Sequence, residues 1–299
     1  MQKDRKESIL LAVNPLAGMG KAVDLLGEYL PALAEDGNPV TVYFTQDEDH
    51  LERILTSEGD RYDRIIVTGG DGSLHQLANL VMEHKIEAKL AYLPLGTMND
   101  FAENLNYPDD IAQVAKLVRL AEPHALDLGK ILPDRYFVYV ASFGIFTASS
   151  YSTPTELKNR VGKLAYFATA LKNLGSVEIY PAQVKLDEET HEGDFIFGAI
   201  LNSCQMGGIV RMDSDSFDLA DGMYEVLLVK KPSGPADVTT ILNALMNTDF
   251  SSDLFIYKKV RSCSLTFDRP VPWTLDGEFG GDLEELSMEV VPHAWKLCF

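Results

Sequence analysis

Long apolar runs are absent from this chain of 299 residues. No stretch approaches the ~18 consecutive apolar residues that a transmembrane helix needs. The basic start, MQKDRKES, is followed by only a short apolar run at residues 9–13. A secretory signal peptide has a longer apolar core and a cleavage site. We therefore expect a protein of the cytoplasm.

Cysteine is also scarce. The three residues Cys204, Cys263 and Cys298 lie far apart, and none belongs to a CxxC pair. An odd number of isolated cysteines argues against a disulfide framework and against a structural zinc site. We expect all three to be buried as small apolar side chains.

Positive charge is in short supply. The chain has 26 Lys and Arg against 45 Asp and Glu, a formal net charge of −19. Nucleic-acid binding needs clustered basic residues, so this balance argues against such a partner. It argues equally against tight electrostatic adhesion to an anionic membrane. The six histidines form no paired metal-binding motif, and only His75 lies near a motif of any kind.

The first half of the chain alternates strand and helix patterns. Strands are predicted over residues 8–14, 40–44, 63–67 and 89–93, and helices over 25–33, 50–56, 73–84 and 110–121. This alternation is typical of a parallel sheet with helices on both faces. In such sheets, ligands bind at the carboxyl ends of the strands.

The pattern changes near residue 128. Strands are predicted over 136–141, 182–186, 195–202, 223–230, 261–267, 271–275 and 286–291, with helices only over 156–174 and 235–246. We therefore predict an α/β nucleotide-binding domain over residues 1–127 and a mostly antiparallel β-sandwich over 128–291. Residues 292–299 can pack back onto the first domain, and the active site is expected between the two.

Three glycine-bearing loops follow predicted strands. The first, residues 14–21, resembles a Walker A loop, but Pro15 replaces its leading glycine and Ala22 its hydroxyl residue. The second, Gly69-Gly70-Asp71-Gly72-Ser73, has glycines that destabilise a strand end unless the backbone must approach a ligand. Asp71 is placed to hold magnesium, with little structural work for its side chain, and Ser73 to cap the next helix. Plain connecting turns are the alternative.

A third loop, residues 94–101, follows the strand at 89–93. Thr97, Asn99 and Asp100 are all suited to cap the helix that follows, although one cap is enough. The surplus indicates contacts with a ligand. A simple turn with one cap remains the alternative.

These loops and three later segments carry a resemblance. They read NPLAG at 14–18, GGDGS at 69–73, LGTMNDFA at 95–102, YSTPTELKNRVGKLAYF at 151–167, FDLADGMYEV at 217–226 and LDGE at 275–278. Together they resemble the diacylglycerol kinase catalytic-domain family, especially its soluble bacterial lipid kinases. GGDG alone is shared with NAD kinases; its combination with GTxND and the late DGE is more specific.

The resemblance implies transfer of the γ-phosphate of ATP, with Mg²⁺, to a lipid hydroxyl, with diacylglycerol as the leading acceptor. It implies that the nucleotide is bound by Asn14, Pro15, Gly18, Thr45, Gly69, Gly70, Gly72, Ser73, Gly96, Thr97, Asn99 and Asp100. Glu278 would be the general base, with Asp276 orienting it or competing for metal, and Asp71 would lie beside the magnesium. A further structural magnesium would be held by Asp221 together with the backbone oxygens of Asp218 and Met223.

Three departures from the family pattern stand out. The chain has Ser73 where the family usually has Thr, and His75-Gln76 where it usually has Asn-Glu. Ala220 stands where an acid is common before Asp221. Two alternatives stay open: an NAD kinase-like small-molecule kinase, and a nucleotide-binding regulator without catalysis.

Contact with a membrane is expected to be transient and at its inner face. Segment 151–175 holds four basic residues against the single acid Glu156, with apolar residues on one helical face. A basic amphipathic segment is suited to lie at a lipid interface. A helix packed on the β domain is the alternative. A homodimer is compatible with the sequence, which does not fix the oligomeric state.

Overall fold

The computed structural model describes residues 6–47, 49–131, 133–145, 177–206, 210–211 and 217–299. It divides the chain into two compact units. The N-terminal unit comprises residues 1–127 and 293–299, and the C-terminal unit residues 128–292. The predicted helix at 156–174, and with it segment 151–175, lies outside the described residues.

A sheet forms the centre of the N-terminal unit. Its strands are β1 (Ile9–Val13), β2 (Val40–Phe44), β3 (Arg64–Gly69) and β4 (Lys89–Pro94), in the order β4-β3-β1-β2. All three neighbouring pairs are parallel. Every residue of β1 and β3 is buried, because helices cover both faces of the sheet. Cys298, near the chain's end, pairs with Ala91 of β4.

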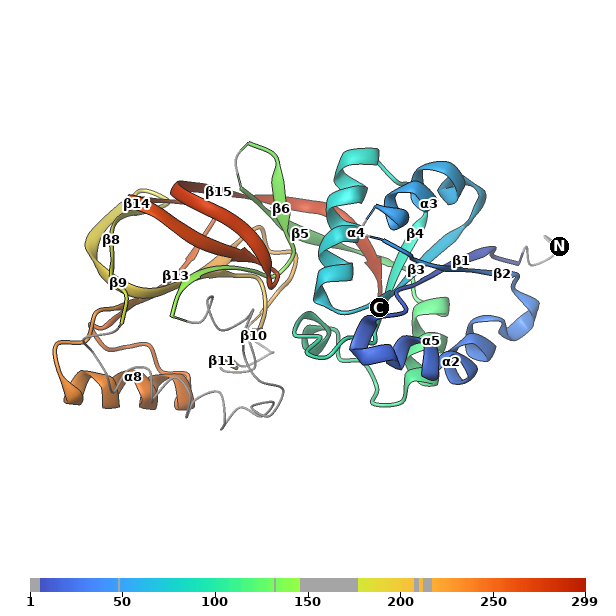
Figure 1. Cartoon of the computed structure of the whole chain (residues 1–299), viewed down its shortest axis with the longest axis horizontal. Helices are drawn as coiled ribbons and strands as arrows, with labels where there is room; N and C mark the ends of the chain where they lie inside the picture. The colour runs from blue at the N-terminus through green and yellow to red at the C-terminus, as the bar shows by residue number, and fades with distance from the viewer. Residues whose placement is uncertain (1–5, 48, 132, 146–176, 207–209, 212–216) are drawn as a thin grey trace. The chain divides into compact units, whose positions relative to one another are not determined.

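Helices lie on both sides of this sheet. They are α1 (Lys21–Asp24), α2 (Leu26–Leu33), α3 (His50–Glu58), α4 (Asp71–His84) and α5 (Ile111–Leu120), with 3-10 turns η1 (Ala17–Gly20), η2 (Glu35–Gly37), η3 (Gly59–Arg61) and η4 (Phe101–Asn104). Figure 1 shows α3 and α4 on one side of the strands and α2 and α5 on the other. The Asp110 carboxylate accepts the Gln113 N–H at 2.8 Å and so begins α5.

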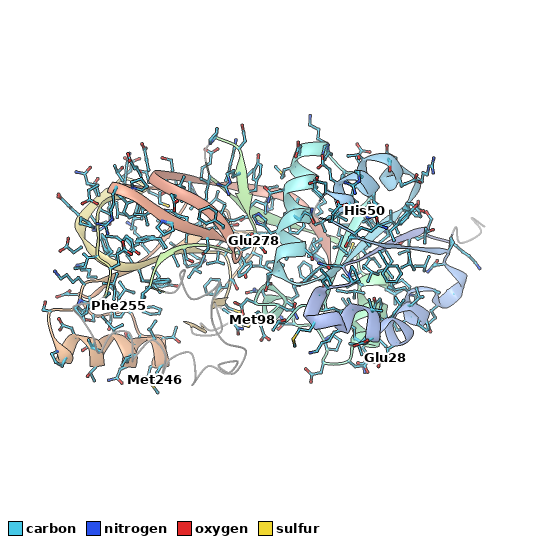
Figure 2. All side chains as sticks on the ribbon, viewed as in Figure 1. Glu28, His50, Met98, Met246, Phe255 and Glu278 are labelled. Carbon is cyan, nitrogen blue, oxygen red and sulfur yellow. The ribbon has the colours of Figure 1, made fainter. Side chains whose placement is uncertain are left out.

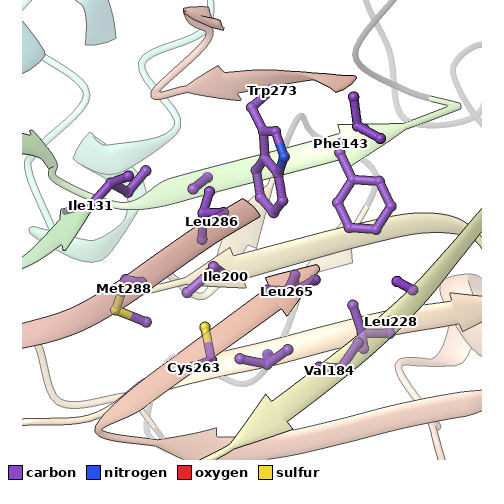
Figure 3. Close-up of a cluster of buried hydrophobic side chains, with 14 of the residues drawn as sticks. Ile131, Phe143, Val184, Ile200, Leu228, Cys263, Leu265, Trp273, Leu286 and Met288 are labelled. Atoms are coloured by element: carbon purple, nitrogen blue, oxygen red, sulfur yellow. The ribbon is translucent and has the colours of Figure 1, made fainter. Parts of the chain in front are cut away.

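The C-terminal unit is rich in strands. They are β5 (Pro123–Ile131), which enters it from the N-terminal unit, β6 (Arg135–Phe137), β7 (Val140–Gly144), β8 (Tyr180–Leu186), β9 (Glu189–Leu201), β10 (Gln205–Met206), β11 (Val210–Arg211), β12 (Tyr224–Lys230), β13 (Phe255–Val260), β14 (Ser262–Leu275) and β15 (Glu278–Cys298), with one described helix, α8 (Pro235–Asn247). Pairings such as β7 with β9 and β14 with β15 are antiparallel. Figure 3 shows the core, where the rings of Phe143 and Trp273 lie 4.9 Å apart.

Several element boundaries differ from the sequence prediction. The strand predicted at 136–141 is two strands, β6 and β7. Strand β9 begins at Glu189, whereas the sequence predicted a start at residue 195. The first half of β9 is polar and largely exposed, a pattern that is typical of a turn, and the prediction missed it for this reason. The strands β5 and β13 were not predicted. No helix among the described residues is long and apolar enough to cross a membrane.

Candidate active site

Three loops meet at one edge of the N-terminal sheet. They follow β1, β3 and β4, whose register pairs Val13 with Thr68 and Gly69 with Pro94. Because these strands are parallel, their carboxyl ends lie at the same edge. The backbone N–H of Asn14 reaches Thr68 O at 3.4 Å, and the N–H of Leu95 donates to Gly69 O at 2.8 Å. The three predicted glycine loops are therefore neighbours.

Glycine is required where these loops touch. A Cβ atom on Gly96 would overlap Gly70 Cα and would lie 2.6 Å from Asn99 Oδ1. Gly18 has a φ of +59°, and a Cβ there would overlap the carbonyl oxygen of Leu95. The sequence interpretation assigned such glycines to close approach of a ligand. In the structure, loop-on-loop packing already requires two of them.

Asn99 fixes the shape of the third loop. Its Oδ1 accepts the Gly96 N–H at 2.9 Å and lies 3.3 Å from the Tyr92 hydroxyl. Its Nδ2 donates to the carbonyl oxygens of Pro94 and Gly96, at 3.1 and 3.2 Å. These contacts use the full hydrogen-bonding capacity of a carboxamide. Asn99 therefore holds the loop, and it does not cap a helix as the sequence predicted.

Asp71 has a structural task that the sequence interpretation missed. Its Oδ2 accepts the N–H of Asp100 at 3.0 Å, and its Oδ1 accepts that of Phe101 at 3.2 Å. The N–H groups at the start of η4 are thus capped by Asp71. The prediction that Thr97, Asn99 or Asp100 caps this segment with its side chain was wrong. The prediction of little structural work for this side chain was wrong. A carboxylate is an oxygen ligand of the kind that magnesium prefers, so the side chain is of the chemical type that the predicted ion needs.

Helix α4 begins at the second loop. It starts at Asp71, two residues before the predicted start, and Gly70 is its extended N-cap without a side-chain bond. Ser73 therefore lies inside the first turn and does not cap the helix; its hydroxyl is 3.5 Å from Asn14 Nδ2. The first N–H groups of an α-helix lack partners within the helix. Here they lie beside the glycines, where an anionic group is favoured.

The remaining predicted nucleotide residues surround this edge. The Thr45 N–H donates to Val13 O at 2.9 Å, just after edge strand β2. Thr97 is exposed, next to the exposed Met98 (Figure 2). Asp100 is buried and contacts Asp71 through its N–H. Burial raises the pKa of the neighbouring Tyr92 hydroxyl well above its usual value, and the negative charge of Asp71 adds to this effect.

The Asp-Gly-Glu sequence forms a tight turn in the C-terminal unit. Asp276 and Gly277, with φ values of 50° and 90°, connect β14 to β15, and Leu275 pairs with Glu278. The Asp276 carboxylate accepts three successive backbone N–H groups, from Val138 at 2.7 Å, Tyr139 at 2.9 Å and Val140 at 3.0 Å. Asp276 therefore anchors the turn to the backbone of residues 138–140.

Glu278 is the exposed carboxylate of this turn (Figure 2). It opens strand β15, so its backbone is held by pairing with β14. Asp276, two residues before it, is 2% exposed. Of the two acids, only Glu278 is thus accessible to a substrate.

The predicted structural magnesium site contains a lysine. Asp221 accepts the Met223 N–H at 2.9 Å with Oδ1, and its Oδ2 lies 2.6 Å from Lys259 Nζ. The same ammonium is 3.4 Å from Glu225, which is buried. Asp218 bonds the Ala220 N–H. Both oxygens of the Asp221 carboxylate thus have a partner, one a backbone N–H and the other an ammonium, and the magnesium site stays a prediction.

Comparison with known proteins identifies the family. The model of the diacylglycerol kinase catalytic domain matches residues 8–131. The model of the YegS C-terminal NAD kinase beta sandwich-like domain matches residues 140–299, more than half of the chain. The chain thus has a diacylglycerol kinase catalytic domain followed by a domain of the YegS C-terminal family, to which more than half of it belongs. The two-domain organisation and the kinase class predicted from the sequence are confirmed.

Individual relatives agree with this assignment. A diacylglycerol kinase of Staphylococcus carnosus is 28% identical to this kinase over 283 residues, which is 94% of the chain and 91% of the relative. A diacylglycerol kinase of Staphylococcus haemolyticus is 29% identical over 285 residues, covering 94% and 84%. A crystal structure of a diacylglycerol kinase from Bacillus anthracis matches the fold with a TM-score of 0.74 at 22% identity, covering 99% and 98% of the chains.

Sequence reasoning missed two residues of these sites. Tyr92 lies in a strand that reads as ordinary core, yet its hydroxyl is 3.2 Å from Gly69 O and links two loops. Lys259 lies in a strand that was not predicted, and the acids that it pairs with are distant in sequence. The tyrosine in the strand KLAYL was the only sequence signal for either.

Proposed function

We propose that this kinase transfers the γ-phosphoryl group of ATP to a lipid hydroxyl, with diacylglycerol as the leading acceptor and phosphatidic acid as product. The observation that carries the proposal is the Asp-Gly-Glu turn. Its first acid, Asp276, is buried and anchors the turn, whereas Glu278 is exposed at the start of a paired strand. Family membership and the names of the relatives support the choice of acceptor.

The N-terminal unit would bind the nucleotide. The start of α4 and the glycine loops offer backbone N–H groups to phosphate oxygens, and the helix dipole favours the negative charge. Asp71, whose carboxylate also accepts the N–H groups of Asp100 and Phe101, would hold magnesium as an oxygen ligand. When bound, the ion neutralises charge on the phosphates. Tyr92 and Asn99 hold the loops in place before the nucleotide binds.

The C-terminal unit would activate the acceptor. Glu278 takes the proton of the lipid hydroxyl, whose oxygen forms a bond to the γ-phosphorus as the bond from that phosphorus to the ADP oxygen breaks. Phosphoryl transfer depends mostly on positioning and charge neutralisation. A positioned base contributes roughly 10²–10⁴-fold to the rate. The rigid turn supplies that positioning.

The test is Glu278→Gln, which preserves size and removes the base. We expect turnover of diacylglycerol to fall by about 10²-fold or more while ATP affinity stays within a few-fold, because a base acts in the transition state. Glu284→Gln, an exposed glutamate on the same strand, is the matched control and should keep full turnover. Near-normal turnover in a folded Glu278→Gln protein would remove the proposed base.

The acceptor assay should include NAD. The family model of the C-terminal domain is described as NAD kinase-like, so a small-molecule acceptor is the second candidate. ATP consumption with NAD and none with diacylglycerol would favour it. ATP binding without phosphorylation of any acceptor would favour a regulatory protein.

We also propose transient contact with the inner face of a membrane, where the lipid acceptor resides. The support is the basic amphipathic pattern of segment 151–175 in the sequence. Each basic residue near an anionic surface contributes about 1 kcal/mol, and salt screens this attraction. Activity on anionic vesicles should therefore fall as salt rises, whereas activity on neutral micelles should not.

A further inference from the structure

Three side chains of the metal-binding type meet in the N-terminal unit, outside the glycine loops. They are Glu52 of α3 and Glu83 and His84 of α4, and one possible ligand atom from each lies within 4.8 Å of the other two. His84 Nε2 is 3.0 Å from Glu52 Oε1. Helices α3 and α4 lie on the same side of the sheet, so two separate segments of the chain supply this cluster (Figure 1).

An ion pair accounts for only two of these side chains. When its imidazole is protonated, His84 pairs with Glu52, and one carboxylate is sufficient for that. Glu83 is a second, exposed carboxylate, and it forms no ion pair with any residue that the structure describes. Two carboxylates beside one imidazolium still have a net charge of −1, and carboxylates this close repel each other. An added cation is therefore electrostatically favoured here.

The end of helix α4 also favours a cation. The helix ends at His84, and the last carbonyl groups of a helix carry partial negative charge that attracts positive ions. This contribution is independent of the two carboxylates. The backbone and the side chains thus act in the same direction at this position.

An ion can reach the cluster from solvent. His84 is one of the residues that line a cavity of about 830 Å³, which lies at the amino ends of β1, β3 and β4. The glycine loops follow the carboxyl ends of the same strands. The cavity and the proposed nucleotide site are therefore at opposite edges of the sheet.

The ligand types select the metal. Zinc binds imidazole nitrogen at ~2.0–2.1 Å and carboxylate oxygen at ~2.0–2.2 Å, which places neighbouring ligand atoms of a tetrahedral site ~3.4 Å apart. His84 and Glu52 are already close to that spacing, and Glu83 would have to move by roughly 1–1.5 Å at most. Magnesium prefers oxygen ligands only, whereas imidazole favours zinc and similar transition metals.

We propose that Glu52, Glu83 and His84 bind one divalent transition-metal ion of the zinc type, with water in the fourth position. The ion joins the first turn of α3 to the last turn of α4. Helix α4 has 14 residues and is about 20 Å long, so the site is separated by that length from Asp71 at the other end of the helix. The proposal does not depend on the proposed function.

The first test is calorimetric titration of the chelator-treated full chain with zinc chloride, without nucleotide. We expect one Zn²⁺ per chain with a Kd below about 100 µM, and millimolar Mg²⁺ should not compete. Glu83→Gln preserves size at an exposed position and breaks no ion pair. It should leave the Tm of the metal-free protein unchanged and weaken zinc binding by about tenfold or more. His84→Ala should abolish the binding.

Thermal unfolding supplies a second measurement. Zinc at a hundredfold excess over its Kd should raise the Tm of wild type by at least ~5 °C, and this rise should be absent in His84→Ala. His124→Ala is the matched control, because it removes an exposed histidine of the same unit, and it should keep both the binding and the rise.

Three results would overturn the proposal. The first is a wild type that shows no saturable zinc binding. The second is a Glu83→Gln protein with wild-type affinity, which would show that His84 and Glu52 form only an ion pair. The third is an equal loss of binding in His124→Ala, which would show that zinc binds exposed histidines without a defined site.

Discussion

Replacing Asp276 with alanine leaves three buried N–H groups without an acceptor. They belong to Val138, Tyr139 and Val140, at 2.7, 2.9 and 3.0 Å, and the carboxylate that joins them is 2% exposed. Each buried group left unsatisfied costs about 1–3 kcal/mol. Allowing for some relaxation, we expect the free energy of unfolding of the C-terminal unit to fall by ~3–6 kcal/mol. Domains of this size have only ~5–15 kcal/mol in total.

Asp276→Asn should be milder. Its Oδ1 can still accept from Tyr139 and Val140, but its Nδ2 then faces the Val138 N–H, so one bond becomes a contact between two donors. We expect a loss of ~2–4 kcal/mol. The control is Asp268→Asn, at an exposed position on β14, which should change stability by less than ~0.5 kcal/mol.

The assay is urea unfolding followed by tryptophan fluorescence. The chain has two tryptophans, Trp273 in the C-terminal unit and Trp295 in the N-terminal unit. A Trp295→Phe background therefore makes the signal specific for the C-terminal unit. If Asp276→Ala is as stable as the parent but inactive, the anchoring role is wrong, and the carboxylate acts in catalysis or metal binding instead.

Two further predictions follow from the loops and from a buried acid. Gly96→Ala should weaken ATP binding by about tenfold or more, because its Cβ would overlap Gly70 and push the second and third loops apart. The control is Gly27→Ala, at an exposed position in α2, which should stabilise the folded protein by up to ~1 kcal/mol. Calorimetric titration measures ATP binding, and thermal unfolding measures stability, for both variants. Burial raises the pKa of Glu225 from 4.5 to about 7 against the opposing effect of Lys259. The folded state thus holds a proton that the unfolded chain releases, so this stabilisation is complete below pH 4.5 and lost as the pH rises to about 7. Glu225→Gln should flatten that fall and gain ~2–3 kcal/mol over wild type at pH 8 in urea unfolding; an unchanged pH profile would show that Glu225 ionises normally.

The local patterns in the sequence were enough to predict the two-domain organisation and most elements. The strand over 40–44 agrees residue for residue with β2, and those at 8–14 and 89–93 agree with β1 and β4 within a residue at each end. Apolar runs and helical periodicity are properties of neighbouring residues, so they are visible along the chain. The polar first half of β9 was missed because its strand conformation depends on pairing with β8.

The motifs themselves also come from the sequence. Asp71, the glycines beside it and Glu278 were selected by residue type and order alone, and the parallel register brings the three loops to one edge. The sequence could not show which partner each carboxylate binds in the folded protein. A carboxylate has the same chemistry whether it binds a metal, a backbone or a lysine.

Tertiary structure decided those assignments. Asp71 caps a turn 30 residues away, Asp276 binds N–H groups up to 138 residues away, and Asp221 pairs with a lysine 38 residues away. No local pattern records such partners, because a hydrogen bond depends on distance in space and not on separation along the chain. The sequence determined which residues are candidates for the chemistry, and the fold determined which of these are buried with backbone or lysine partners and which are exposed.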